Sequence, residues 1–295
     1  MRGVPAGLYG WAVLLLLCCW APLAGADPWL APGDPALRSD LQLLADEGVV
    51  RTPITSWPLS WADVVRDLNA VQSIDLRTPS LADAYGRVRR EARRNTRVGN
   101  IGRHVEVQAA EHPMRMRGFE DTPREDAEFG GGLDWVGDRF ATRLQVRRVL
   151  DPDDGKSVRL DGSYAGMVVG NVMISAGYLE KWWGPGWAGS LILSSNARPI
   201  PSITIERNYS TPFRVPVLKR LGPWRASFQA GRLESQRSDH PRAHFMALRV
   251  AFRPARSLEI GLSRTAQLCG HGRDCGLGTY WDMVAGRDGN GDPAQ

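Results

Sequence analysis

The sequence predicts a mainly β membrane protein, namely part of a transmembrane β-barrel with a small N-terminal α-helical bundle. From about residue 101 onward, apolar and polar residues alternate, which is the period of a strand with two different faces. The alternating runs are about 9–12 residues long, the length that a tilted strand needs to cross a bilayer. Arginine, glutamine and glutamate occupy the second face, as the wet interior of a barrel requires.

The composition excludes several other classes of protein. The chain has 295 residues, 43% of them apolar, and a net charge of only +5, so it can bury a core and does not read as disordered. Two of its four cysteines, Cys18 and Cys19, lie in an apolar leader. The two that remain exclude a disulfide-stapled mini-domain and a four-cysteine zinc fold.

Residues 1–26 have the pattern of a secretory signal peptide. Arg2 supplies the positive charge, residues 11–20 form the apolar segment, and Ala24-Gly25-Ala26 makes a small-residue cleavage site. The alternative is an uncleaved anchor helix, but the apolar run is shorter than the ~20 residues of a bilayer span. We therefore expect an exported chain that begins near Asp27.

Residues 27–96 predict three short helices of about ten residues each. One apolar stripe ends at Gly48, in the position of a helix C-cap. Ser60 followed by Asp63 predicts the start of a second helix, and Ser80 followed by Asp83 predicts the start of a third. A unit of this size should pack against something larger.

Residues 97–295 predict the barrel portion. In the run 245–253, Met246, Leu248, Val250 and Phe252 face one side while Ala247, Arg249, Ala251 and Arg253 face the other. Further runs at 128–135, 139–150, 158–169, 172–182 and 258–263 alternate with tight turns and with long polar connections such as 111–125 and 184–202.

About eight or nine strands are predicted, whereas single-chain bacterial barrels have an even number. The polar tail 287–295 does not resemble a closing strand, so we expect a portion of a larger barrel. A secreted β-sandwich is the alternative fold, although a sandwich exterior usually carries more lysine than this chain does.

The segment 180–199 is the most distinctive part of the chain. Trp182, Trp183 and Trp187 lie among glycines and a proline, which predicts a rigid aromatic platform on which sugar rings stack. Asn196 and Arg198 could then bind hydroxyl or carboxylate groups. The alternative is an aromatic belt at the membrane interface with a loop folded into the barrel.

The same segment resembles the signature of the capsule assembly Wzi family. The resemblance rests on Trp182-Trp183-Gly184-Pro185-Gly186-Trp187, on 190–194 and on Asn196-Ala197-Arg198-Pro199, together with the stretch 34–61. It covers most of residues 27–285. It implies an outer-membrane barrel with a periplasmic helical bundle, in a Gram-negative-type bacterium, with a lectin-like role in holding capsular polysaccharide. Members of the family are longer, which agrees with the partial barrel expected from the pattern.

The remaining motifs predict no enzyme, no cofactor and no bound metal. Cys269 and Cys275 should form a disulfide in an oxidising compartment, the alternative being a metal site that includes His271. His240 and His244 are four residues apart, but not on a predicted helix, and the sequence contains no nucleophile or phosphate-binding motif. A pair of glycosidase carboxylates is a remaining alternative.

The predicted partners are an acidic capsular or exported polysaccharide and outer-membrane lipid, with no nucleic acid and with the protein as a monomer. A different function would be a pore for anionic solutes. Four arginines on the predicted interior face would then line the channel: Arg143, Arg147, Arg249 and Arg253.

Overall fold

A computed structural model describes residues 27–72, 76–114, 116–152, 154–237, 239–273 and 275–287. The predicted leader, residues 1–26, lies outside the described residues, as do the last eight residues of the polar tail. Within the described part of the chain, every helix falls short of the length and apolar character that a bilayer-spanning helix needs.

Three helices precede the sheet: α2 (Pro35–Asp46), α3 (Trp61–Asn69) and α4 (Pro79–Asn95). The Ser60 hydroxyl accepts a hydrogen bond from the Asp63 amide at 3.3 Å, which confirms the predicted start of α3. The start predicted at Ser80 is wrong: Thr78 caps α4, and the helix has 17 residues. Pro79 favours the earlier start, because its fixed φ suits the first helical position.

The three helices, with the segments that flank them, share one apolar core that also receives residues from beyond Ile101. We call the part of the chain before the sheet, residues 27–96, the helical unit. Phe119 and Trp182 belong to the same buried cluster as Trp57 on β2 (Ser56–Trp57). The short strand β1 (Trp29–Leu30) pairs with β3 (Leu59–Ser60). The helical unit is therefore packed against later parts of the chain, as its small size led us to expect.

A ten-stranded antiparallel sheet makes up the rest of the molecule. Its order is β14-β13-β12-β11-β9-β8-β6-β5-β4, with β7 paired to β6 beside this path. The strands are β4 (Ile101–Ala109), β5 (Ala127–Val136), β6 (Phe140–Leu150), β7 (Val158–Arg159), β8 (Tyr164–Val169), β9 (Val172–Gly177), β11 (Ser202–Arg207), β12 (Trp224–Arg232), β13 (His244–Ala255) and β14 (Leu258–Leu268). Among the described residues the edge strands β4 and β14 do not pair with each other, so the barrel is open.

Two predicted strands are shorter than expected. The run 158–169 is interrupted between β7 and β8, and the run 172–182 ends at Gly177. Trp182 and Trp183 form a separate strand, β10 (Trp182–Trp183), that pairs with β2 of the helical unit. Gly177 has φ +150°, and a Cβ there would lie 2.3 Å from the Ser163 carbonyl oxygen, so the chain leaves the sheet at a residue that needs to be glycine.

The sheet is polar inside and apolar outside. On β13, Leu248 is 46% exposed while Arg249 on the next position is buried. Glu206 and Gln229 are likewise buried on the inner face of β11 and β12, whereas Ile205 faces outward. This is the polarity predicted for a membrane barrel and the reverse of a soluble sandwich.

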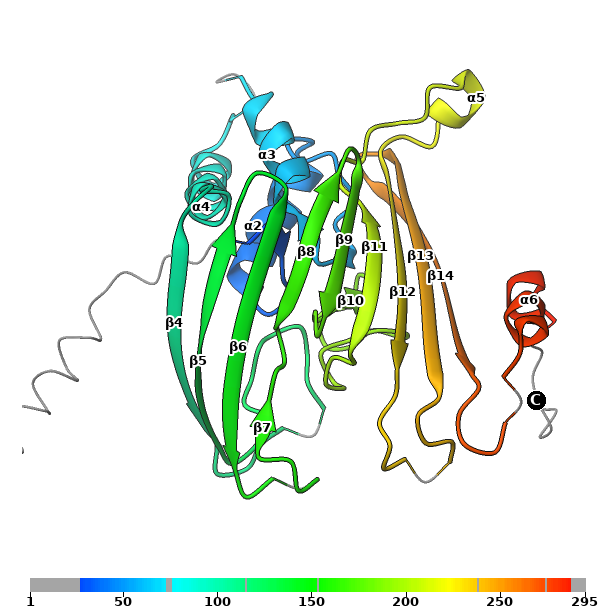
Figure 1. The fold of residues 1–295 in the computed structure, drawn as a ribbon. Coiled ribbons are helices and arrows are strands. Elements are labelled where there is room, and N and C mark those ends of the chain that lie inside the picture. Colours follow the sequence, from blue (N-terminus) through cyan, green and yellow to red (C-terminus); the bar gives the residue numbers. More distant parts are fainter. Residues whose placement is uncertain are drawn as a thin grey trace, which may run out of the picture.

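The two ends of the sheet differ. Figure 1 shows the helices packed inside the curved sheet at one end, which we call the helical-unit end. The tight turns 137–139 and 170–171 lie at this end, together with the connection that carries α5 (Pro216–Lys219). The longer connections 110–126, 151–163 and 233–243 lie at the opposite, long-loop end, and α6 (Leu277–Ala285) lies beside the β14 edge of the sheet.

Candidate functional site

The connection 178–201, which carries the distinctive tryptophans, folds into the interior of the sheet. Trp183 donates its backbone N–H to the Leu193 carbonyl at 2.9 Å, and Gly184 donates to the Thr55 carbonyl at 2.9 Å. The indole Nε1 of Trp182 donates to the Gly186 carbonyl at 2.9 Å. The connection is thus an ordered structure between the helical unit and the barrel wall, not a free loop.

The predicted platform of three tryptophans is wrong for two of its members. Trp182 is 0% exposed and Trp183 is 3% exposed, so neither offers a face to a sugar. The pairing of β10 with β2 places Trp182 in the apolar core, where its ring lies edge-on to Phe119 at 5.5 Å. The membrane-belt alternative is wrong for these residues as well, because they lie inside the sheet; its expectation of a loop folded into the barrel is confirmed.

Trp187 is the member of the three that is accessible, with 44% of its surface exposed. One face of its ring is covered by the Arg38 guanidinium, whose Cζ lies 4.3 Å from the ring centroid. Arg38 also donates to the Pro185 carbonyl at 2.8 Å. Burial lowers the pKa of Arg38 to about 10, so the group that holds the tryptophan stays charged at neutral pH.

Asn196 is exposed and lies where two connections meet. Its Oδ1 accepts a hydrogen bond from the Arg117 amide at 3.1 Å. The neighbouring Ser195 donates its hydroxyl to the Gly118 carbonyl at 2.6 Å, and the Arg117 guanidinium donates to the Ser195 carbonyl at 2.9 Å. These bonds fix Asn196 in the connection 178–201 to the connection 110–126.

Arg198 is the centre of a chain of ion pairs. Its guanidinium contacts Asp161 at 2.6 Å and Glu125 at 2.5 Å. Glu125 in turn faces Arg159 at 3.7 Å, and Arg159 pairs with Asp154 at 2.5 Å. Alternating charges from three connections therefore hold one another in place, with the Arg198 side chain 20% exposed.

Two cavities border Arg198. The first has a volume of about 210 Å³ and the second about 280 Å³. Ile192 and Phe245 give the first an apolar wall, while Ser194 and Gln229 supply hydroxyl and amide groups. Lys156, Tyr178 and Glu234 make the second more polar. A concave surface with apolar walls and a few fixed hydrogen-bonding groups is the usual form of a small-ligand or sugar site.

Sequence reasoning missed the residues that hold Arg198. Glu125 was expected in the polar connection 111–125, Arg159 and Asp161 were expected in the strand run 158–169, and Arg117 was not singled out. No local spacing links them to Arg198, because Glu125, the segment 159–161 and Arg198 lie in three separate connections that meet only when the sheet curves. The structure therefore brings Trp187, Asn196 and Arg198 to one region and removes Trp182 and Trp183 from the accessible surface.

The four interior arginines of the pore alternative are engaged with other groups. Arg143 pairs with Asp27 at 3.0 Å, and Arg147 pairs with Glu106 at 2.9 Å. Arg249 donates to the Ser56 hydroxyl at 2.6 Å. Arg253 donates to carbonyls of the helical unit, at 2.6 Å to that of Ala45 and at 3.0 Å to that of Val50. Three of the four thus hold the N-terminal segment against the wall, which does not favour an open anion channel.

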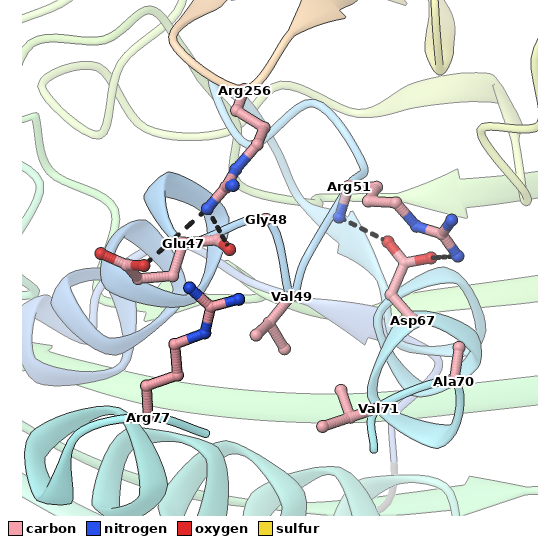
Figure 2. A pocket seen from close by; sticks show the side chains of 9 residues that line it. All are labelled: Glu47, Gly48, Val49, Arg51, Asp67, Ala70, Val71, Arg77 and Arg256. Carbon is pink, nitrogen blue, oxygen red and sulfur yellow. Dashed lines mark hydrogen bonds and ion pairs between the residues drawn. The ribbon is translucent and has the colours of Figure 1, made fainter. Parts of the chain in front are cut away.

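A third cavity, of about 330 Å³, lies at the seam between the helical unit and the turn from β13 to β14 (Figure 2). Arg256 reaches from that turn to the Glu47 carbonyl at 2.5 Å. A Cβ on Gly48 would lie 2.7 Å from the Arg256 Nε. The Asp67 carboxylate accepts from the Arg51 amide at 2.7 Å. This seam is a structural contact of the helical unit, away from Arg198.

Cys269 and Cys275 form a disulfide with a Cα–Cα distance of 4.8 Å, which confirms the predicted pairing. His244 lies beside them, with the three candidate ligand atoms within 4.8 Å of one another. Because each sulfur is bonded to the other, neither is a thiolate that could ligate a metal. His271, which the metal alternative included, does not belong to this group.

Three comparisons place the chain among known proteins. The family model described as capsule assembly protein Wzi matches residues 96–295. An uncharacterized 55.8 kDa protein in the cps region of Klebsiella pneumoniae is 28% identical over 264 residues, which cover 89% of this chain and 51% of that protein.

A solved structure from Escherichia coli has the same fold, with a TM-score of 0.75 and 27% identity over 86% of this chain and 56% of that one. That protein, Wzi, is described as an outer membrane protein involved in group 1 capsule assembly and as a carbohydrate-binding β-barrel. The present chain spans about half the length of these relatives. By the match over residues 96–295, this chain belongs to the capsule assembly protein Wzi family.

Proposed function

We propose that this protein is a lectin-like, non-enzymatic component of the outer membrane that binds capsular or exported acidic polysaccharide and retains it at the cell surface. The E. coli relative is described as a carbohydrate-binding barrel involved in capsule assembly. The leader predicted from the sequence and the apolar outer face of the sheet support the same location. We further propose that the mature chain begins after Ala26 and acts as a monomer surrounded by lipid.

The observation that carries the binding site is the position of Arg198 between two cavities at the long-loop end. Asp161 and Glu125 hold its guanidinium, so a ligand would bind it with little loss of side-chain freedom. The part of the group left accessible could donate to hydroxyl or carboxylate oxygens of a sugar. Asn196 and Trp187 would add an amide and an aromatic face on the same connection.

Because the charges around Arg198 are largely paired, each sugar unit would bind weakly. A long polymer presents many such units, and weak contacts along it add up to retention without one tight site. This mode of binding needs no chemical change of the polymer. Incubation with purified polysaccharide should therefore release no new chain ends.

The test compares cell-bound and released polysaccharide in cells that carry the whole gene, its deletion, or the gene with Arg198→Gln. We expect normal synthesis in all three, release into the medium in the deletion strain and partial release with Arg198→Gln. Arg90→Gln, an exposed position on α4, is the matched control and should retain polymer normally. Unchanged retention in the deletion strain would contradict the anchoring role and favour the alternative function, a pore for anionic solutes.

A further inference from the structure

The connection between β11 and β12, residues 208–223, extends from the helical-unit end of the sheet and carries α5 at its tip (Figure 1). We call it the α5 hairpin. Its tip exposes Val215, Val217 and Leu218, which are 54%, 74% and 42% exposed. The hairpin also contains three basic residues, Arg214, Lys219 and Arg220, and no aspartate or glutamate. The tip is therefore both apolar and positively charged.

The base of the α5 hairpin is built from ordered contacts. The Phe213 ring stacks on Trp224 with the centroids 4.5 Å apart and the planes 8° from parallel. The Arg207 guanidinium lies 3.9 Å from the Trp224 centroid and donates to the Thr211 carbonyl at 2.9 Å. Gly222 has φ +70°, and a Cβ there would lie 2.0 Å from the Arg253 carbonyl oxygen. These contacts set the direction in which the hairpin leaves the sheet.

The hairpin continues the outer, apolar face of the sheet. Arg225 points inward, where it donates to the Pro58 carbonyl at 3.0 Å, so the adjacent Trp224 faces outward. Trp135 near the end of β5 and Phe140 at the start of β6, 38% and 56% exposed, lie at the same end of the sheet. Aromatic side chains at the end of an apolar belt are typical of the level of the lipid headgroups in membrane barrels. The tip of the α5 hairpin lies just beyond this level.

We propose that the α5 hairpin docks on the anionic phospholipid surface that surrounds the helical-unit end of the barrel. Val217 and Leu218 enter the headgroup region, while Arg214, Lys219 and Arg220 bind lipid phosphates. A short amphiphilic segment with basic residues on its polar side binds an anionic membrane surface in this way. The inference rests on the proposed outer-membrane placement of the barrel.

The test uses the protein expressed from its whole gene and inserted in vesicles of phosphatidylcholine, alone or mixed with phosphatidylglycerol. Val217→Cys is labelled with an environment-sensitive fluorophore, and quenching by iodide in the water is measured. Cys269 and Cys275 are in a disulfide, so they do not compete for the label. Leu248→Cys reports the apolar belt, and Ala82→Cys, exposed on α4, reports the aqueous side.

We expect the labels at 217 and 248 to be quenched several-fold less than the label at 82. The protection at 217 should increase with phosphatidylglycerol and fall when Arg214, Lys219 and Arg220 are all changed to Gln, each removed charge corresponding to a roughly fivefold loss of local lipid affinity. Protection at 248 but not at 217 would overturn the inference and leave the proposed function intact. Exposure at 248 would overturn the membrane placement itself. If protection at 217 changes neither with phosphatidylglycerol nor with the replacement of the three basic residues by Gln, the hairpin does not recognise anionic headgroups.

Discussion

Arg38, on the first helix of the helical unit, lies with its guanidinium 4.3 Å from the ring centroid of Trp187 in the connection 178–201. The same guanidinium lies 4.3 Å from the Phe119 centroid, so the cation is held between two rings. A contact of this kind with a partly desolvated arginine contributes about 1–2 kcal/mol. It fixes one face of Trp187 and leaves the rest of the ring accessible.

This arrangement predicts different effects for two neighbouring tryptophans. Trp187→Ala should weaken polymer binding with little loss of folded protein, because the ring is partly exposed. Trp182→Ala should lower the free energy of unfolding by about 3–5 kcal/mol, because it empties a buried site. Polymer binding and denaturant midpoints of both variants separate the two effects. Equal losses of stability in both would show that Trp187 has only a structural role.

Glu180 predicts a pH dependence of stability. Burial raises the pKa of its carboxyl, even though Arg124 lies 3.4 Å away. Between the ordinary pKa of a glutamate and the raised value, the folded protein binds more protons than the unfolded chain. The free energy of unfolding should therefore fall as the pH rises through that window. Denaturant midpoints measured from about pH 4 to pH 8 should show this fall, and Glu180→Gln should flatten it. The same slope in the variant would assign the dependence to another group.

Arg253 holds the helical unit in place inside the sheet, so its removal should raise the conductance of the barrel. Its guanidinium donates to the carbonyls of Ala45, Val50 and Arg256. Arg253→Leu leaves these acceptors without the charged donor and should cost roughly 3 kcal/mol. In planar bilayers we expect low conductance from the unaltered protein and more frequent openings from this variant. Arg90→Gln should behave as the unaltered protein does, and high conductance before any substitution would favour the pore function.

Removing the disulfide should destabilise only the loop that it closes. Cys269 and Cys275 are six positions apart, so the bond closes a short loop and stabilises it by about 2 kcal/mol. Replacing both with Ser should make residues near this loop more sensitive to protease, because the loop opens more often. Polysaccharide retention should stay unchanged, since Arg198 lies in another connection. Loss of retention in the double variant would indicate that the loop takes part in binding.

The strands with a clear alternation were predictable because the polarity of each side chain indicates which face of the sheet it occupies. Leu248 and Arg249 adopt the outward and inward positions that their period of two requires. The cap at Ser60 was likewise predictable, since the hydroxyl bonds an amide three residues away. The start of α4 was not, because Thr78 and Ser80 are both suitable caps and the choice depends on Pro79.

For the candidate site, the sequence predicted some features and the tertiary structure was needed for the others. The sequence by itself determined that residues 180–199 were distinctive, that the interior face was polar and that Cys269 pairs with Cys275. Only the tertiary structure decided which tryptophans are accessible, because β10 pairs with a strand from the helical unit and takes Trp182 and Trp183 into the core. It also decided that Glu125 and Asp161 pair with Arg198 and that Arg159 pairs with Glu125. Ion pairs between separate connections leave no periodic trace in a sequence, since they depend on where the curved sheet brings the chain back together.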